Sequence, residues 1–217
     1  MLVAVVASGD LAADDVRWLD RAELVIAADG GAATLEQIGR RPDRLVGDLD
    51  SVDASLVARL TDAGVPIDRH PTDKDATDTE LALQDAVTGG ATEIVLLGAL
   101  GGDRLDHELA NLLLLADRET ARLTVRIVHG PTTVHVLHAG SLALEGRVAD
   151  LVSLLPIDRD AVGVTTEGLR WPLDGATLRI GRSRGISNEI VTGPASIEVR
   201  DGTLLVIETA IKGATHP

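Results

Sequence analysis

The chain has 217 residues, 45% hydrophobic and 25% charged, a composition that is typical of globular proteins and excludes a disordered or fibrous one. Twenty Lys and Arg against 34 Asp and Glu leave a net charge of −14, which argues against nonspecific nucleic-acid binding. The chain contains no cysteine, which excludes disulfides and thiolate metal sites.

No segment approaches the roughly 18 consecutive apolar residues of a membrane span. The apolar run at 2–7 is short and follows no basic stretch, so it predicts a first strand rather than a signal peptide. We therefore expect a soluble, cytoplasmic protein that binds neither nucleic acid nor a membrane. Because Tyr and Phe are absent, its core must consist of Leu, Val, Ile and Ala.

The first 130 residues alternate short apolar runs with amphipathic stretches. Runs rich in Val and Ile predict buried strands at 2–7, 23–28, 44–47, 94–98 and 123–128. Helices are predicted at 11–20, 31–39, 53–63, 78–88 and 106–118, with Thr77 as the N-cap of the fourth. This alternation predicts a Rossmann-like parallel sheet with helices on both faces over residues 1–130.

The pattern changes near residue 130. Short apolar runs separated by Gly, Pro, Asp and Ser predict strands at 133–137, 141–145, 150–155, 161–166, 176–180, 186–191, 195–200 and 203–208. No helix-length periodic stretch follows. Residues 131–217 therefore predict an antiparallel sandwich or barrel.

Aspartates gather just after the predicted strands, where ligands bind in an open parallel sheet. They are Asp29, Asp48, Asp50, Asp73, Asp75, Asp78, Asp103 and Asp106. Two carboxylates about 4 Å apart repel by about 4 kcal/mol at an effective dielectric of about 20, so such a group needs a cation. Oxygen ligands suit Mg²⁺, which proteins often share with substrate phosphates. A single aspartate is more often a helix cap, as we expect for Asp53 and Asp62, but the grouping favours a site.

Two glycine-rich turns lead from strand to helix at the same edge, at 29–31 and 98–102. Glycine lets backbone N–H groups approach an anion closely, although both segments are also compatible with ordinary tight turns. Neither is a GxxxxGK[ST] or GxGxxG fingerprint, which disfavours a P-loop kinase and a dinucleotide oxidoreductase. Arg104 and Lys74 could each hold a phosphate or simply pair with a nearby acid. The histidines show no zinc-ligand spacing.

These motifs, in this order, resemble those of the thiamine pyrophosphokinase (thiamin diphosphokinase) family. The match comprises AADGGA (27–32), PDRLVGDLDS (42–51), DKDATDTELAL (73–83), LLGALGGDRLDHELANLLLL (96–115), GLRWPL (168–173) and RGISNEI (184–190). The specific part is the GDxDS, DxTD and GGxxxDH set with the later SNE. Many relatives read GGRxDH, whereas this chain has GGDRLDH with an additional Asp103.

The resemblance implies an N-terminal α/β ATP-binding catalytic domain, here 1–130, and a C-terminal thiamine-binding β-sandwich, here 131–217. It implies an enzyme that transfers the pyrophosphoryl group of ATP to the hydroxyl of thiamine, giving thiamine diphosphate and AMP, with Mg²⁺. It also implies a homodimer with sites between subunits.

Matched position by position, the resemblance implies three groups of site residues. The catalytic group is Asp48, Asp50, Asp75, Asp78, Asp106 and Arg104. Of these, Asp48, Asp50, Asp75 and Asp78 would hold the metal, Asp106 would orient or deprotonate the hydroxyl, and Arg104 would offset phosphate charge. The ATP-binding group is Asp29, Gly30, Gly31, Gly101, Gly102 and Lys74. The thiamine-binding group is Ser187, Asn188 and Trp171, although Trp171 is equally compatible with the sandwich core.

Two alternatives remain open on the sequence. The same scaffold could diphosphorylate another alcohol, such as a hydroxymethyl-pterin, and only GLRWPL and RGISNEI favour thiamine. It could also be a non-catalytic sensor of nucleotide or thiamine diphosphate, which the intact acidic motifs disfavour.

Overall fold

The structure, a computed structural model, describes residues 1–117 and 122–211. It divides into two compact units, Met1–Gly130 and Pro131–Pro217. Two residues considered in the sequence predictions lie outside the described residues. They are the last residue of the helix predicted at 106–118 and the histidine at 216. Among the residues that the structure describes, no helix is long and apolar enough to cross a membrane.

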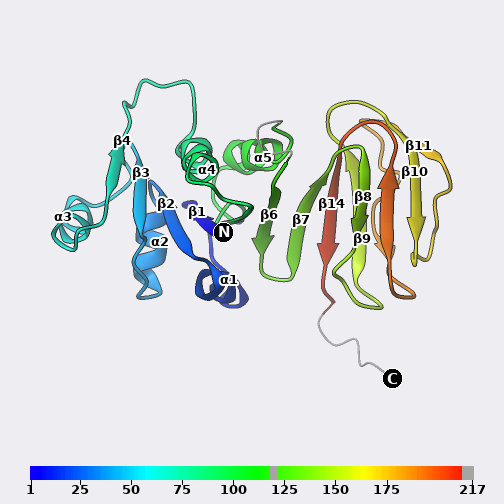
Figure 1. Ribbon diagram of the computed structural model, residues 1–217, viewed down its shortest axis with the longest axis horizontal. Helices are drawn as coiled ribbons and strands as arrows, with labels where there is room; N and C mark the ends of the chain where they lie inside the picture. The colour runs from blue at the N-terminus through cyan, green and yellow to red at the C-terminus, as the bar shows by residue number, and fades with distance from the viewer. Residues whose placement is uncertain (118–121, 212–217) are drawn as a thin grey trace. The chain divides into compact units, whose positions relative to one another are not determined.

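The first unit contains a parallel sheet with the strand order β6-β5-β1-β2-β3-β4 (Figure 1). The strands are β1 (Leu2–Val6), β2 (Leu24–Ala28), β3 (Arg44–Gly47), β4 (Ile67–Arg69), β5 (Glu93–Leu97) and β6 (Thr124–His129). All were predicted within one residue at each end except β4. This short edge strand has a half-buried Ile67 followed by exposed Asp68 and Arg69, so it lacks the apolar run that marks a buried strand.

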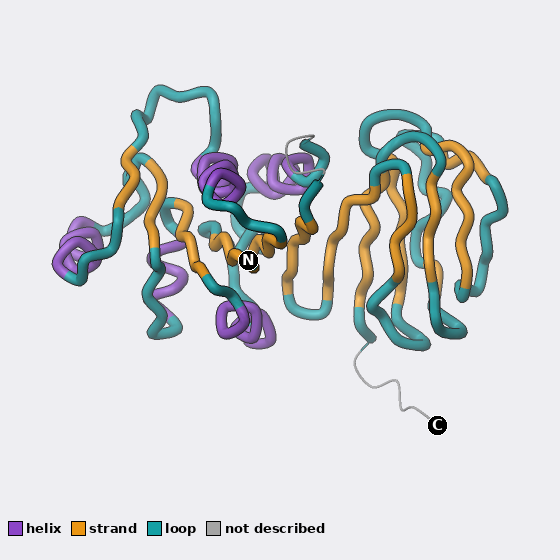
Figure 2. Tube along the Cα trace, viewed as in Figure 1, coloured by secondary structure: helices purple, strands orange, loops and turns teal. Residues whose placement is uncertain are grey.

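Helices cover both faces of this sheet, which confirms the predicted fold class (Figure 2). They are α1 (Val16–Arg21, after a 3₁₀ turn at Ala13–Asp15), α2 (Gly31–Gln37), α3 (Ala54–Asp62), α4 (Asp78–Thr88) and α5 (Leu105–Leu114). Leu19, Leu35 and Leu56 of α1, α2 and α3 share one core cluster. The expected cap holds for α4, where Thr77 Oγ1 accepts the Glu80 N–H at 3.2 Å.

Three helix predictions were wrong at their ends, and the first of these, at 31–39, stops at Gln37. The helix expected at 106–118 ends at Leu114, because the chain turns there and buries Leu115 completely. The helix expected at 11–20 begins only at Val16, after the 3₁₀ turn. Asp53 caps α3 as expected, with Oδ1 accepting the Ser55 N–H at 2.7 Å, whereas Asp62 is the last residue of that helix.

The second unit is an antiparallel β-sandwich. Its strands are β7 (Thr132–Leu137), β8 (Gly140–Ala143), β9 (Leu151–Pro156), β10 (Ala161–Glu167), β11 (Ala176–Leu178), β12 (Asn188–Glu189), β13 (Ser196–Val199) and β14 (Leu204–Thr209). One sheet has the order β12-β9-β14-β7 and the other β11-β10-β13-β8. Leu154 and Val206 of the first sheet share a core cluster with Val164 and Ile197 of the second, so the two sheets pack face to face.

Candidate active site

The strand order of the first unit reverses between β1 and β5. Ligands of open α/β sheets bind outside the carboxyl ends of the strands at such a switch point. Two loops start there, Ala7-Ser8-Gly9 after β1 and 98–102 after β5. The strands β2 and β3 end at the same edge, so the aspartates that follow them are brought close to it (Figure 1).

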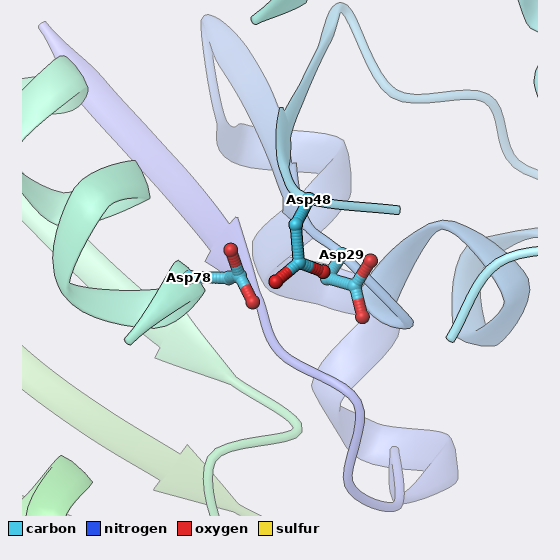
Figure 3. Close-up of side chains that lie close together, drawn as sticks. All are labelled: Asp29, Asp48 and Asp78. Atoms are coloured by element: carbon cyan, nitrogen blue, oxygen red, sulfur yellow. The ribbon is translucent and has the colours of Figure 1, made fainter. Parts of the chain in front are cut away.

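Three carboxylates meet beside this edge. Asp29 follows β2, Asp48 follows β3 and Asp78 is the first residue of α4, and one oxygen from each lies within 4.8 Å of the others (Figure 3). Asp29 is buried, and its Oδ1 has no hydrogen-bond partner among the described residues. A buried carboxylate oxygen without a donor is costly, so this cluster is suited to a cation.

Lys74 supplies part of the positive charge that the cluster needs. Its Nζ lies 2.7 Å from Asp48 Oδ2 and 3.1 Å from Asp78 Oδ1, and its side chain is only 14% exposed. When all three aspartates are ionised, the cluster together with Lys74 carries a net charge of −2. An all-oxygen ligand set with that residual charge fits a divalent ion such as Mg²⁺.

The pKa values in the cluster shift in opposite directions. Burial raises the pKa of Asp29, and the carboxylates of Asp78 and Asp48 add to this against a hydrogen bond from Ser51. The pKa of Asp48 is lowered, chiefly because its carboxylate accepts a hydrogen bond from Lys74. Burial disfavours the charge of Lys74, but its hydrogen bonds to Asp48 and Asp78 outweigh that effect and raise its pKa.

Gly47 leaves room for the cluster. A Cβ at this position would lie 3.0 Å from Asp29 Cβ and 3.1 Å from Asp78 Oδ1, and its φ of 150° is one that other residues rarely adopt. Gly31 has a packing role, since a Cβ there would lie 1.9 Å from the Val6 carbonyl oxygen. A Cβ at Gly30, the N-cap of α2, would lie 2.9 Å from Ser8 Cβ.

The structure does not bring Asp50 and Asp75 into this cluster. Both are exposed, and the group of three close carboxylates found among the described residues contains neither. Leu49, between Asp48 and Asp50, has a φ of +67°. Asp50 Oδ1 accepts the Ser51 hydroxyl hydrogen bond at 2.9 Å, and its N–H donates to Asp48 Oδ1 at 3.2 Å.

A pocket of about 290 Å³ opens at the switch point. Its walls include Ser8 and Gly9 after β1, Gly102 and Arg104 in the glycine-rich loop, and Asn111 of α5. Asn111 is buried and donates from Nδ2 to the Ala99 carbonyl at 2.9 Å, which ties α5 to the loop. Ser8, Gly9 and Asn111 were not predicted as site residues, although SGD after the first strand resembles the glycine-rich turns at 29–31 and 98–102.

Arg104 and Asp106 form an exposed ion pair. The guanidinium donates to both carboxylate oxygens, Nε to Oδ1 at 3.0 Å and Nη2 to Oδ2 at 2.7 Å. The hydrogen bonds from Arg104 lower the pKa of Asp106 to about 2. Asp103 and His107 line the pocket together with Arg104.

The second unit has its own pocket, of about 280 Å³, lined by Leu154, Trp171, Pro172, Leu173, Arg184, Gly185, Ile186 and Asn188. The Trp171 side chain is 60% exposed, so it is not part of the sandwich core. The Arg170 guanidinium lies 5.8 Å from the Trp171 ring centre and pairs with Glu189 at 2.9 Å. An exposed indole beside a pocket can stack on a flat ring.

Asn188 holds the Trp171 backbone in place. Its Oδ1 accepts the Trp171 N–H at 3.1 Å, and its Nδ2 donates to the Trp171 carbonyl at 2.8 Å. The side chain is buried, so these reciprocal hydrogen bonds fix the wall of the pocket. Ser187 is exposed with a φ of +57° and donates its N–H to Ser153 Oγ at 3.0 Å.

A parallel sheet with a carboxylate cluster and a glycine-lined pocket at its switch point is typical of α/β proteins that bind phosphorylated ligands with a metal ion. Comparison with known families narrows this class. Residues 16–127 match the thiamin pyrophosphokinase catalytic domain, and residues 141–204 match the thiamin pyrophosphokinase vitamin B1 binding domain. The chain belongs to the thiamin pyrophosphokinase family.

Individual relatives agree. The chain is 27% identical over 210 residues to the thiamine pyrophosphokinase of Bacillus subtilis, covering 95% of this chain and 98% of the relative. It is 30% identical to thiamine pyrophosphokinase 3 of Oryza sativa subsp. japonica, covering 79% and 73%. The crystal structure of the B. subtilis protein superposes with a TM-score of 0.86 at 26% identity, covering 97% of this chain and 99% of that one. The Geobacillus thermodenitrificans thiamin pyrophosphokinase gives 0.84 at 29% identity, covering 99% and 100%.

This membership confirms the family resemblance that the motifs indicated. It also confirms that the chain is an enzyme, a kinase of the transferase class connected with thiamine diphosphate biosynthesis. The family implies ATP and thiamine as substrates.

Proposed function

We propose that the chain transfers the pyrophosphoryl group of ATP to the hydroxyl group of thiamine. The hydroxyl oxygen forms a bond to the β-phosphorus, and the bond from that phosphorus to the α,β-bridging oxygen breaks. AMP leaves with the bridging oxygen, thiamine diphosphate forms, and the hydroxyl proton passes to a base. The observation that carries this proposal is the Asp29–Asp48–Asp78 cluster at the ligand-binding edge of a chain that matches both family domains.

We propose that Asp48 and Asp78, with Asp29, hold Mg²⁺. Bound there, the ion would offset the negative charge of the ATP phosphates. Asp50 and Asp75 are exposed residues of the loops after β3 and before α4, and their proposed contribution to the metal site runs through water. The fit rests on the donors themselves, which are all carboxylate oxygens, and on the unpartnered Asp29 Oδ1.

The remaining groups of the first unit act on ATP and on the hydroxyl. Phosphoryl-type transfer depends mainly on positioning and charge neutralisation. Arg104 exchanges Asp106 for a phosphate, and the freed Asp106 orients the hydroxyl and takes its proton. The proposed ATP contacts are Asp29, Gly30, Gly31, Gly101, Gly102 and Lys74. Lys74 contributes to ATP binding by neutralising part of the negative charge of Asp48 and Asp78, with which it forms ion pairs.

In the second unit, the Trp171 ring stacks on a ring of thiamine and Asn188 holds the Trp171 backbone in position. Ser187 precedes Asn188 in the chain and is the third proposed thiamine-binding residue. The support for this assignment is the exposed indole, the pocket beside it and the match of 141–204 to a vitamin B1 binding domain.

We further propose that the enzyme works in the cytoplasm as a homodimer with sites between subunits. Leu105, Leu109 and Leu113 recur every fourth residue along α5 and are 68%, 53% and 57% exposed. Such an apolar stripe favours burial against another protein surface. Light scattering of the wild type and of Leu109→Lys tests the assembly. We expect the wild type to be a dimer and the variant to be a monomer. A monomeric wild type would contradict the proposed homodimer.

The reaction is tested by mass spectrometry of ATP with thiamine, with and without Mg²⁺. The expected products are AMP and thiamine diphosphate, and their formation should depend on Mg²⁺. ADP with thiamine monophosphate would show transfer of a single phosphoryl group instead. A parallel assay with a hydroxymethyl-pterin distinguishes the other alcohol, and tight binding of thiamine diphosphate without AMP formation would indicate a sensor.

A further inference from the structure

The glycine-rich loop already binds an anion that the chain itself supplies. The N–H groups of Gly101 and Gly102 both donate to Glu108 Oε1, at 2.8 and 3.0 Å. Gly101 has a φ of +81°, which turns two successive N–H groups toward one point. Successive N–H groups that converge in this way form an anion-binding nest, and here one carboxylate oxygen occupies it.

The residue that fills the nest belongs to α5. Glu108 lies in the first turn of that helix, is half-buried and lines the switch-point pocket together with Arg104. Asp106, two residues earlier, accepts two hydrogen bonds from Arg104. In this structure, therefore, carboxylates of α5 engage both the N–H pair and the guanidinium that could bind a phosphate.

A carboxylate oxygen and a phosphate oxygen can accept the same two hydrogen bonds from an N–H pair, because each is an anionic acceptor of charge-assisted hydrogen bonds. The two cannot occupy one nest together. If a phosphate entered the pocket while Glu108 stayed, the N–H pair would be unavailable and two like charges would lie side by side.

We infer that the Glu108 carboxylate holds the place of a phosphate oxygen in the glycine loop and must leave it for the triphosphate of ATP to bind. This inference rests on the proposed ATP site and makes Glu108 a positioning residue that sets nucleotide affinity. Its displacement costs part of the binding energy, so Glu108 keeps the affinity for ATP lower than the loop alone would give.

The opposite role is that Glu108 holds the loop in its binding shape, and the two roles differ in the sign of a measurable effect. Glu108→Gln keeps an acceptor but removes the charge, and Glu108→Ala removes both. Isothermal titration calorimetry is carried out in Mg²⁺ with two probes, a non-hydrolysable ATP analogue and inorganic triphosphate. The Kd of both probes should fall by roughly three- to tenfold in Glu108→Ala and by less in Glu108→Gln.

Glu80→Gln is the matched control. It removes one negative charge from the first turn of α4, where Glu80 Oε1 accepts from Gln84, and Glu80 is not a lining residue of the pocket. Its Kd values should stay within about twofold of the wild type, because Glu80 does not line the pocket and salt screens a charge that lies outside it. A fall equal to that of Glu108→Gln would mean that general charge removal explains the effect, and it would overturn the inference.

A second measurement tests whether the phosphate and Glu108 contact the same two N–H groups. In ¹⁵N–¹H spectra of the wild type, triphosphate should shift the Gly101 and Gly102 amide resonances, and Glu108→Ala should shift the same two without ligand. Weaker binding of both probes by Glu108→Ala, with wild-type binding intact, would overturn the inference alone and leave the proposed reaction standing. A wild type that binds neither probe would overturn both.

Discussion

Replacing Lys74 by Met removes the positive charge that lies 2.7 Å from Asp48 and 3.1 Å from Asp78 while keeping most of the apolar side chain. Breaking a buried ion pair costs about 3–5 kcal/mol, and breaking an exposed one costs about 0–1 kcal/mol. The side chains of Lys74, Asp48 and Asp78 are 14%, 8% and 23% exposed, so about 2–3 kcal/mol is expected here. For a chain of this length that corresponds to a fall in Tm of about 4–12 °C.

Differential scanning calorimetry in EDTA and in Mg²⁺ measures this effect. In EDTA the variant should show the full fall in Tm, because three carboxylates remain without their internal cation. Mg²⁺ should raise the Tm of Lys74→Met by more than that of the wild type, since ligand binding to the folded state stabilises it and the variant offers the more negative site. The control is Arg40→Met, which removes one positive charge from an exposed pair with Asp20 and should cost about 1 kcal/mol or less.

The dependence on pH has a definite sign. The pKa of Asp48 is lower in the folded chain than the unperturbed value of about 3.9, so its stabilising contribution is present above that value and is lost as pH falls through the folded pKa. The gap in Tm between wild type and Lys74→Met should therefore narrow below about pH 4. A fall in Tm of less than about 1 °C in EDTA, with no narrowing in acid, would refute the counter-ion role.

Three further predictions concern other parts of the site. Asp106 should titrate near pH 2 by ¹³C NMR and shift toward about 4 in Arg104→Gln, and an unchanged midpoint would show that Arg104 is not the cause. Trp171→Ala should raise the Kd for thiamine at least roughly tenfold with a change in Tm of about 1 °C or less, because the ring is exposed, whereas a loss of several degrees would place the ring in the core. Gly47→Ala should lose about 1–3 kcal/mol of stability and the Mg²⁺-dependent rise in Tm, because its Cβ would crowd Asp78; retention of both in calorimetry would contradict that packing.

Much of the fold could be predicted because its strands are buried on both faces. Strands such as β1 and β5 are nearly continuous apolar runs, which the sequence displays directly. The edge strand β4 is exposed along most of its length, so no apolar run marks it and only its pairing with β3 defines it. The early end of α5 is equally invisible in the periodicity, because Leu115 continues the apolar pattern while the backbone turns.

The candidate site was predictable in its location but not in its membership. Asp29, Asp48 and Asp78 are recognisable because each follows a strand or opens a helix at the ligand-binding edge. Which carboxylates converge depends on the start of α4, which the Thr77 cap predicted, and on β2 lying beside β3, which does not follow from spacing along the chain. Asp50 is only two residues from Asp48, yet Leu49 between them is left-handed and Asp50 is exposed.

Glu108 is the clearest case of a residue that the sequence could not reveal. At the start of a helix, a glutamate is expected for its interaction with the helix dipole. Only the turn at Gly101 brings two N–H groups within hydrogen-bond distance of its carboxylate. The side chain thus acquires its role from a loop that precedes it in the chain and folds back over it.

Two internal groups occupy the site: Lys74 contacts the acidic cluster and Glu108 contacts the glycine loop. Because their charges are opposite, each affects the binding of a different part of the ligand. A metal–triphosphate complex carries both signs, a cation for the carboxylates and an anion for the N–H pair. Each internal group thus repels or competes with the ligand group of the same charge. The measured affinity is the difference between the free energy of the ligand's contacts and that of the internal contacts that it disturbs. Removing an internal group should tighten the binding of the ligand part that carries the same sign of charge, Mg²⁺ for Lys74→Met and triphosphate for Glu108→Ala. Removing a group that contacts the ligand directly should weaken binding, so the sign of the change distinguishes the two roles without any assumption about magnitude.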